Sequence, residues 1–287
     1  MDLITKLKPE NFPSALREIP QPPKELYMRG TLPPPDYIYL AVVGSRKHTS
    51  YGKDACDKLI KGLKGYPIVI VSGLALGIDS IAHKAALSAG LITLAMPGSG
   101  LDNKVLYPRS NANLASDIVR NGGCMLSEFP PTMKAELYTF PQRNRLMAGI
   151  SKATLVIEAA EKSGTLITAR MALDYNRDVL AVPGQIFSNT SSGTNKLIRQ
   201  GATPIATSEE LLEALGFEVN KIKENPSDKY KECGKDELKI IALLNEPMER
   251  DELIRASGME TSRASALLSI MEIKELIKEE LGEIRLA

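Results

Sequence analysis

The chain has 287 residues, of which 43% are hydrophobic and 25% are charged, so it can bury one large core and has room for a second, smaller unit. Its 36 Lys and Arg residues nearly balance 35 Asp and Glu residues, so bulk charge does not indicate a nucleic-acid-binding protein. No run approaches the ~18 apolar residues of a transmembrane helix, and the opening MDLITKLKPE lacks a signal-peptide core. We expect a soluble, cytoplasmic protein with no membrane partner.

The cysteine pattern excludes two classes of small scaffold. Cys56, Cys124 and Cys233 stand far apart and form no CxxC pair, and His48 and His83 are the only histidines. Disulfide frameworks and zinc sites depend on closely spaced cysteines or on Cys and His clusters. We therefore predict no metal site.

The region from residue 37 to residue 217 alternates short apolar runs with helical patterns. The apolar runs span residues 37–43, 67–72, 91–96, 124–127, 153–158 and 178–183, and helical patterns include 51–65, 78–90 and 165–176. This alternation predicts βαβ units, and hence a Rossmann-like α/β domain with a mostly parallel, doubly wound sheet. Residues 1–36 are rich in proline, which favours extended segments, so we predict a lead-in to the first strand.

The C-terminal part of the chain has a different pattern. Residues 218–235 are polar and suit a linker between domains. Residues 236–287 contain three helical patterns and a hairpin candidate, with Gly258 in a turn and Thr261 as a predicted N-cap. This order indicates a small winged-helix-like domain, although other three-helix units share much of the pattern.

Two glycine-containing loops follow the first two predicted strands. Gly44-Ser45-Arg46 comes directly after residue 43, at the sheet edge where ligands bind open α/β domains. The segment 72–79, SGLALGID, opens a helix whose N–H groups could hold an anion. Both loops suit phosphate binding. The alternatives are a tight turn with a solvated arginine in the first loop, and glycines needed only for packing in the second.

Neither loop matches a common nucleotide motif. A dinucleotide site needs G-x-G-x-x-G and a carboxylate ~20 residues further on, and neither Gly44 nor Gly73 is followed by that set. The chain also has no G-x-x-x-x-G-K-[ST]. A dehydrogenase and a P-loop ATPase are therefore unsupported.

The segment FPQRNR, residues 140–145, combines an aromatic ring with two arginines. Pro141 favours a first helical position, which would leave Phe140 just outside a helix whose opening turn carries both guanidiniums. An aromatic ring beside cations at a positive helix end could stack a base and hold its phosphates. The alternative is that Phe140 is a hydrophobic staple and the arginines pair with carboxylates such as Glu136 or Glu158.

Further anion-suited loops follow, without a recognisable catalytic set. Ser163-Gly164-Thr165 lies between a strand and a helix, and the segment 193–202 offers similar chemistry. Several such loops at one sheet edge favour a polyanion over a single nucleotide. Nothing pairs Asp79, Glu128 or Glu158 with a nucleophile, and His83 suits helix packing. We therefore predict a protein without catalytic residues.

An ordered set of motifs resembles the DNA-processing protein A (DprA/Smf) family. The set is VVGSR (42–46), SYG (50–52), SGLALGID (72–79), SEFP (127–130), FPQRNR (140–145), EAAEKSGTLITA (158–169), NRDVLAVPG (176–184) and GTNKLIRQGA (193–202). The resemblance extends from about Leu16 to Phe217, and the C-terminal unit looks like the winged-helix appendage of that family.

The resemblance implies a non-catalytic protein that binds single-stranded DNA, forms a homodimer, and needs no cofactor. It implies protection of incoming single strands and loading of RecA recombinase during natural transformation. Lys134 is carried over as a substitute for a lysine that the family has near FPxRNR. The expected DNA-binding residues are Gly44, Ser45, Arg46, Ser72, Gly73, Gly77, Lys134, Phe140, Arg143, Asn144, Arg145, Ser163, Gly164, Thr165, Asn195 and Lys196.

Two other functions stay open from the residues. A nucleotide-binding Rossmann-like enzyme or sensor would use similar glycine loops, but it would bind a mononucleotide in a closed pocket. A protein-interaction role would give the C-terminal unit a partner protein or duplex DNA. The helix predicted over 261–277 carries both acidic and basic residues, a mixed pattern more typical of a solvated face.

Overall fold

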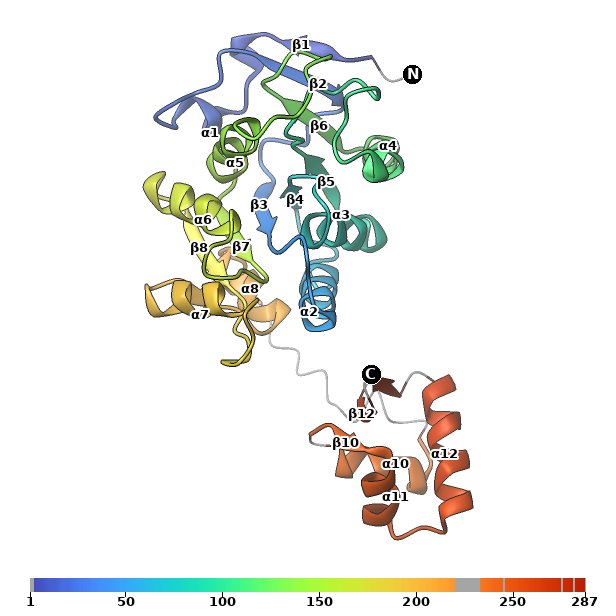
Figure 1. Ribbon diagram of the computed structural model, residues 1–287. Coiled ribbons are helices and arrows are strands. Elements are labelled where there is room, and N and C mark those ends of the chain that lie inside the picture. Colours follow the sequence, from blue (N-terminus) through green and yellow to red (C-terminus); the bar gives the residue numbers. More distant parts are fainter. Residues whose placement is uncertain (1–2, 220–232, 245, 275, 281, 287) are drawn as a thin grey trace. The chain divides into compact units, whose positions relative to one another are not determined.

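The computed structural model describes residues 3–219, 233–244, 246–274, 276–280 and 282–286 (Figure 1). The chain divides into two compact units, Met1–Val219 and Asn220–Ala287. Most of the predicted linker 218–235 lies outside the described residues. Among the helices of the described ranges, none is long and apolar enough to cross a membrane.

The first unit is built on a nine-stranded sheet of order β1-β2-β6-β5-β4-β3-β7-β8-β9. Its strands are β1 (Thr5–Leu7), β2 (Leu26–Gly30), β3 (Ile38–Val43), β4 (Ile68–Ser72), β5 (Ile92–Ala95), β6 (Cys124–Ser127), β7 (Ala153–Val156), β8 (Asp178–Ala181) and β9 (Thr203–Pro204). Every neighbouring pair from β6 to β9 is parallel, whereas β1–β2 and β2–β6 are antiparallel. The predicted mostly parallel α/β sheet is confirmed.

Helices cover both faces of this sheet (Figure 1). They are α1 (Ser14–Arg17), α2 (Ser50–Lys61), α3 (Ile78–Ala89), α4 (Ala112–Arg120), α5 (Thr139–Ile150), α6 (Thr165–Asp174), α7 (Ser192–Arg199) and α8 (Ser208–Ala214), with short 3-10 turns at Pro9–Asn11 and Arg109–Asn111. In Figure 1, α5, α6 and α7 lie on one side, and α2, α3 and α4 on the other.

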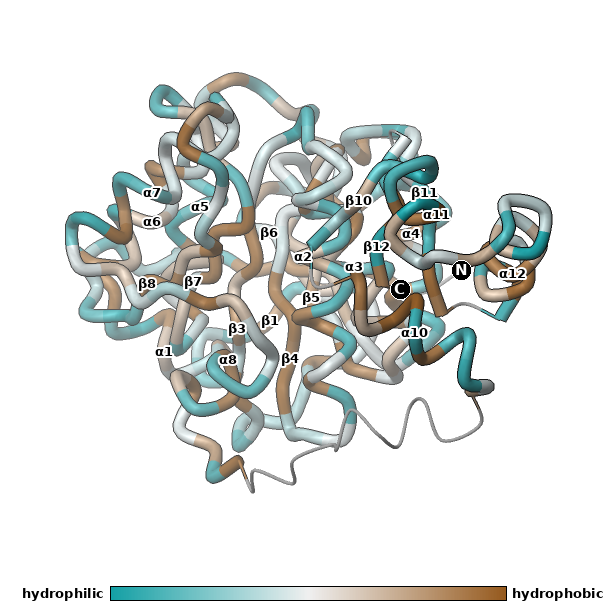
Figure 2. Tube along the Cα trace, turned by 90° about the horizontal axis from the view of Figure 1, so that it is seen from below, coloured by the Kyte–Doolittle hydropathy of each residue, from teal (hydrophilic) through white to brown (hydrophobic). Residues whose placement is uncertain are grey.

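The strands are apolar on both faces because both faces are covered. In β4, Ile68 and Ile70 pack with α2, α3 and α8, whereas Val69 and Val71 pack with α1, α5, α6 and α7. All four side chains are fully buried. Figure 2 shows the result as hydrophobic strands such as β4 at the centre of the unit and hydrophilic stretches on the outer helices.

The proline-rich lead-in is part of this unit. It contributes β1 and β2, which extend the sheet beyond β6. Leu16 and Leu26 are fully buried in the main core. Proline content alone indicated an extended segment, but it could not reveal the antiparallel pairing, because pairing depends on the distant strand β6.

Strand order defines one special position in the sheet. The chain moves outward from β3 through β4, β5 and β6, and then returns to place β7, β8 and β9 on the other side of β3. The connections after β3 and β7 therefore leave in opposite directions and open a crevice at their carboxyl ends. Such a switch point is where open α/β sheets bind ligands.

The second unit is a winged-helix domain. Its elements are α10 (Lys235–Leu243), β10 (Met248–Glu249), α11 (Arg250–Ser257), α12 (Thr261–Ile273), β11 (Ile277–Glu280) and β12 (Glu283–Leu286). Two details differ from the sequence prediction. Glu260, not Thr261, is the N-cap of α12, and α12 ends at Ile273 because Ile277 belongs to the hairpin that closes the apolar core. Gly258 ends α11 in the left-handed region, with φ 63°.

Candidate functional site

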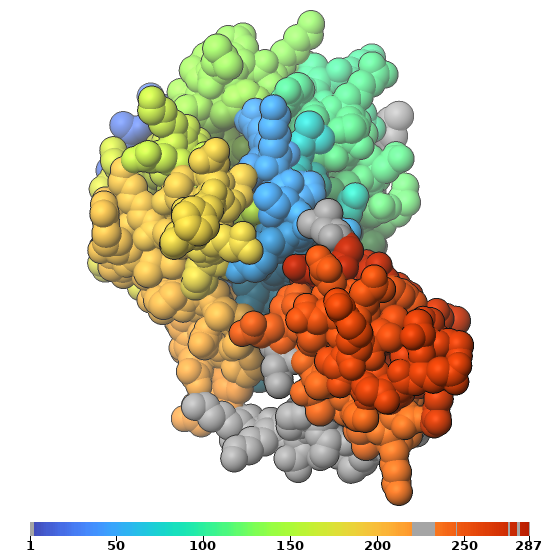
Figure 3. Space-filling view, turned by 60° about the horizontal axis from the view of Figure 1, so that its bottom comes forward, coloured from blue at the N-terminus to red at the C-terminus, as the bar shows by residue number. Residues whose placement is uncertain are grey.

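An open cavity of about 660 Å³ lies at the switch point. It is lined by Val43, Gly44, Ser45, Arg46, Lys47, Ala75, Asp79, Phe140, Pro141, Arg143, Asn144, Met147, Ala160, Ser163, Gly164, Thr165, Ile167, Thr168 and Thr190. In Figure 3 the blue surface that follows β3 lies between the yellow surface of the segment before α7 and the green surface that precedes and includes α5. The structure thus brings together residues from four separate loops.

Two glycines pack the loop after β3 against the start of α3. A Cβ atom on Gly44 would overlap the Ile78 side chain, and one on Gly77 would overlap the backbone oxygen of Ser45. Gly77 also has φ +79°, which favours glycine. The Ile78 N–H donates to the Ser45 oxygen at 3.1 Å. These glycines therefore fix the position of the neighbouring Arg46 by close backbone packing.

Arg46 is exposed, and its guanidinium lies beside an aromatic ring. Its Cζ atom is 5.1 Å from the centroid of the Phe140 ring, a distance at which a cation is attracted to the ring face. The Phe140 ring meets Tyr107 edge to face at 5.9 Å. Phe140 lies within the first turn of α5, which begins at Thr139, so its predicted place outside the helix is wrong.

Arg143 lies largely beneath the cavity surface. The residue is 5% exposed, its guanidinium donates to the Met96 backbone oxygen, and its Nε donates to the Asn144 Oδ1 at 3.1 Å. Burial lowers the pKa of Arg143 to about 10, and the nearby Asp79 carboxylate opposes this shift. The guanidinium is therefore committed to contacts inside the protein, although part of the residue lines the cavity.

Asp79 and His83, one turn apart on α3, are buried next to Arg143. The Asp79 carboxylate accepts the N–H groups of Gly73 at 3.1 Å and Ala75 at 3.4 Å, and burial raises its pKa. His83 Nδ1 lies 2.7 Å from the Thr93 hydroxyl, and burial lowers the pKa of His83 to about 3. We refer to Asp79, His83 and Arg143 as the buried cluster.

Arg145 is also used internally. It pairs with Glu128 and donates to the Gln21 oxygen at 2.7 Å, and the Arg145 and Glu128 side chains are only 11% and 14% exposed. Burial raises the pKa of Glu128. Carboxylate pairing, the alternative interpretation of FPQRNR, therefore holds for Arg145, but with Glu128 rather than Glu136 or Glu158.

Glu158 instead ties two loops together beside the cavity. It is buried and accepts the Thr49 N–H at 3.0 Å, the Thr49 hydroxyl at 2.6 Å and the Thr190 hydroxyl at 3.0 Å. The same carboxylate lies against Gly52, where a Cβ would overlap it. Glu158 thus holds the start of α2 and the loop before α7 in place.

The Ser-Gly-Thr turn faces the cavity. Gly164 is exposed, and a Cβ there would meet no atom. The Ser163 hydroxyl accepts the Thr165 N–H at 3.2 Å and donates to the Thr165 hydroxyl at 3.0 Å, and α6 begins at Thr165. This turn leaves open space at a helix N-terminus, where an anion is favoured.

The remaining predicted residues do not line the main cavity. Ser72 is buried and donates to the Val42 oxygen at 2.7 Å. Both ends of the Asn195 amide bond to the Gly184 backbone, at 3.2 and 3.0 Å, and Lys196 pairs with Glu161 at 3.2 Å. Lys134 is exposed, and Gly73 lines a small neighbouring cavity with Arg46, Tyr107 and Phe140.

Sequence reasoning missed three residues of this site. Lys47 and Thr190 line the cavity; Lys47 directly follows the motif VVGSR, and Thr190 lies between the motifs that end at Gly184 and begin at Gly193. Tyr107 belongs to an aperiodic segment between β5 and α4, and only the three-dimensional structure places it against Phe140.

The chain is similar in sequence and in fold to known proteins. The chain is 40% identical to the protein Smf of Escherichia coli over 77% of its own length, and it spans 59% of the length of that relative. The solved DNA processing protein A of Streptococcus pneumoniae superposes with a TM-score of 0.69 at 37% identity, covering 75% of each chain. That of Helicobacter pylori, whose structure concerns its single-stranded DNA binding mode, gives 0.66 at 31% identity, covering 75% of this chain and 98% of that one.

Two family models account for most of the chain. The model described as DNA recombination-mediator protein A matches residues 3–216, and the DprA winged helix domain matches residues 228–282. The chain therefore belongs to the DNA recombination-mediator protein A family, and its relatives include proteins named DprA and Smf.

Proposed function

We propose that this protein binds single-stranded DNA without catalytic turnover, with the strand crossing the cavity at the switch point. Arg46 and Lys47 hold phosphates, the Phe140 ring stacks on a base, and the turn of Ser163, Gly164 and Thr165 receives a further phosphate. Bases have π faces that are available only when they are unpaired, so stacking selects single strands.

One observation carries this proposal. The exposed Arg46 guanidinium lies 5.1 Å from the Phe140 ring at the mouth of an open cavity. An aromatic ring beside a cation is the combination that proteins use to hold a base and its phosphate together. The H. pylori relative, with its single-stranded DNA binding mode, supports the same choice of ligand.

The wider role that we propose follows the family. The protein acts in the cytoplasm as a homodimer, protects incoming single strands, and helps to load RecA recombinase during natural transformation. Arg143, Arg145, Asn195 and Gly77 shape this site rather than contact DNA, since their polar groups or backbones are already committed inside the protein.

Fluorescence anisotropy over a salt series tests the proposal. Arg46→Ala should weaken binding of single-stranded oligonucleotides about tenfold, the effect of losing one charge-assisted contact. It should also reduce the slope of log K against log salt by about 0.7, the share of one phosphate on a single strand. Arg120→Ala is the matched control, because Arg120 is 72% exposed on α4 and lies away from the cavity.

Two results would contradict the proposal. Equal affinity for duplex and single strands would remove base stacking as the source of selectivity. Competition by a mononucleotide at a concentration equal to that of the oligonucleotide would instead favour a nucleotide sensor, since a cavity of about 660 Å³ can hold one nucleotide.

A further inference from the structure

The loop between β8 and α7, residues 182–191, carries an exposed aromatic ring. Phe187 is 95% exposed and the adjacent Ile186 is 83% exposed. Large apolar side chains normally lose contact with water on folding, so two such neighbours on a tip indicate a surface that contacts a ligand or partner.

This loop is anchored on both sides of its tip. The Asn195 amide brackets Gly184 with two hydrogen bonds, and the Thr190 hydroxyl donates to Glu158 at 3.0 Å. Within the loop, the Ser191 N–H donates to the Ser188 oxygen at 3.1 Å. Its ends are fixed, so the Phe187 ring is presented by a supported turn, which lowers the entropic cost of binding.

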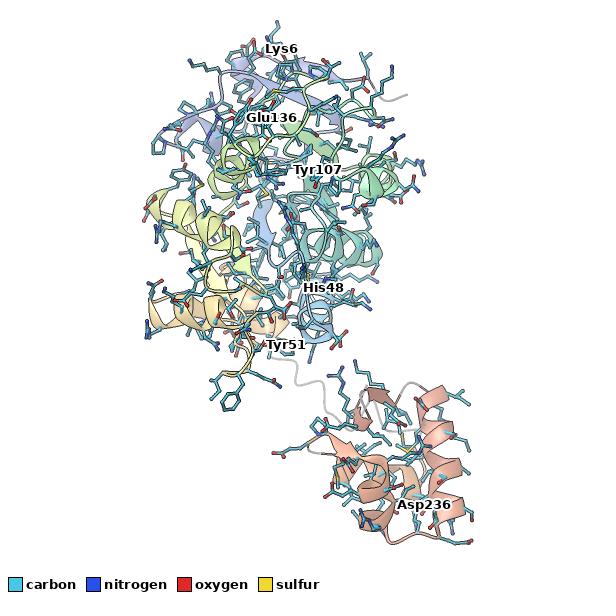
Figure 4. The ribbon with its side chains drawn as sticks, in the orientation of Figure 1. Lys6, His48, Tyr51, Tyr107, Glu136 and Asp236 are labelled. Carbon is cyan, nitrogen blue, oxygen red and sulfur yellow. The ribbon has the colours of Figure 1, made fainter. Side chains whose placement is uncertain are left out.

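The same loop borders the cavity. Thr190 is one of the cavity-lining residues, and the Ala159 N–H donates to the Thr190 oxygen at 2.7 Å. Near the other end, the exposed Tyr51 donates its hydroxyl to the Pro183 oxygen at 2.6 Å. Figure 3 shows the yellow loop segment beside the blue segment after β3, and Figure 4 shows Tyr51 and His48 at the start of α2, away from Tyr107.

Aromatic rings therefore occur on both sides of the cavity. Phe140 and Tyr107 form one aromatic pair, in which Phe140 lines the cavity. On the other side, Tyr51 contacts Pro183 of the β8–α7 loop, and that loop carries Phe187 at its tip and lines the cavity through Thr190. The Ser163–Thr165 turn lies on the cavity wall. The loop sequence VPGQIFSNTS carries no charged side chain, so it does not repel phosphates. This layout suits a chain of alternating phosphates and bases better than one compact ligand.

We propose that Phe187 is a second base-stacking platform, which binds an unpaired base of the same strand that Arg46 and Phe140 hold. The inference rests on the proposed function and deepens it, because it assigns a second contact and a path for the strand. The path runs from Phe140, past the Ser163–Thr165 turn, to the tip of the β8–α7 loop.

The experiment measures binding of oligothymidylates of increasing length to the full chain and to Phe187→Ala. Loss of one stacked base should weaken binding of the longer oligonucleotides about 5- to 150-fold. The salt slope should stay unchanged, because no charge is removed. The shortest oligonucleotides that still bind, which reach only Arg46 and Phe140, should be indifferent to the substitution. Phe187→Trp, which keeps an aromatic ring at this position, should bind the longer oligonucleotides as tightly as the wild type does.

The matched control is Ile186→Ala, at a neighbouring exposed position without a π face. A fluorescent adenine analogue, whose emission responds to stacking, is placed at successive positions of a long oligonucleotide. Phe187→Ala should change the emission at one position, and Phe140→Ala should change it at a different position. Sedimentation at the same concentrations shows whether the oligomeric state has changed.

The outcomes separate this inference from the proposed function. If the wild-type protein binds no single strand, the proposed function fails. If the wild type binds and Arg46→Ala weakens it, but Phe187→Ala binds every length normally, only the second platform is wrong. If Phe187→Ala dissociates an oligomer and Ile186→Ala does the same, the tip is a contact between protein chains, and the inference is overturned.

Discussion

The cavity surface and the buried cluster use the same residue types in opposite ways. On the surface, Arg46 is exposed, and its Cζ atom lies 5.1 Å from the centroid of the Phe140 ring. Beneath it, Arg143 is 5% exposed, its guanidinium donates to the Met96 backbone oxygen, and the Asp79 charge opposes the lowering of its pKa by burial. A buried charge is tolerated only with partners, so the Arg143 guanidinium is held by contacts inside the protein, whereas Arg46 remains available to a ligand.

This difference explains why residue 73, in the loop after β4, is a glycine. A Cβ on Gly73 would overlap the Arg143 guanidinium, while the Gly73 N–H reaches Asp79 at 3.1 Å. The loop that was predicted to cradle a phosphate is thus shaped around an internal cation and anion. Under the proposed function this loop acts on DNA only indirectly, through the placement of Ala75 and Arg46 at the cavity.

The largest expected effect is that of Arg143→Ala on stability. Removing the guanidinium leaves Asp79 buried without its main cationic neighbour, which should lower the free energy of unfolding by about 3 kcal/mol. Arg46→Ala, at an exposed position, should change it by less than about 0.5 kcal/mol. Urea denaturation of both variants measures the contrast. Normal stability of Arg143→Ala together with lost DNA binding would make Arg143 a direct DNA contact.

The next effect concerns pH. Burial, aided by the Arg143 charge, lowers the pKa of His83 from 6.5 to about 3 in the folded protein. The unfolded chain binds a proton below about pH 6.5 and the folded chain does not, so this contribution to stability is complete above pH 6.5 and is lost as the pH falls toward 3. The loss should be about 1.4 kcal/mol per pH unit, or about 2 kcal/mol by pH 5.

Denaturation from pH 7 to pH 5 measures this dependence. His83→Gln should lose stability less steeply over that range than the wild type does, whatever its stability at pH 7. His48→Gln is the matched control, because His48 is exposed. An identical pH dependence in His83→Gln and the wild type would show that His83 does not titrate as a buried neutral group.

Much of the fold followed from the sequence because its signals are local. Short apolar runs separated by helical patterns predicted the parallel α/β sheet, and three helices with a hairpin predicted the winged helix. The lead-in strands escaped prediction, since β2 is held by pairing with the distant strand β6 (Tyr27 with Ser127). Proline content carries no information about such a partner.

The site was predicted less completely, for a related reason. Motif and spacing located Arg46, Phe140 and the Ser163–Thr165 turn, which the structure brings to one cavity. They could not separate Arg46 from Arg143 and Arg145, because the partners of the last two, Met96 and Glu128, directly follow the distant strands β5 and β6. Whether an arginine is free for a ligand depends on tertiary contacts, and residue type does not reveal it.

Tyr107 gives the smallest and most specific test of this distinction between surface and interior. Its ring is 49% exposed and meets Phe140 edge to face at 5.9 Å, a contact worth about 1 kcal/mol in orienting a ring. Tyr107→Leu keeps an apolar side chain but removes the edge contact, so single-strand affinity should fall about fivefold. Because no charge is lost, the salt slope should match that of the wild type, unlike the slope of Arg46→Ala. If Tyr107→Leu instead binds DNA normally and its free energy of unfolding falls by about 1 kcal/mol, the Tyr107–Phe140 contact belongs to the protein interior, as Arg143 does. The DNA-binding surface is then confined to the neighbourhood of Arg46.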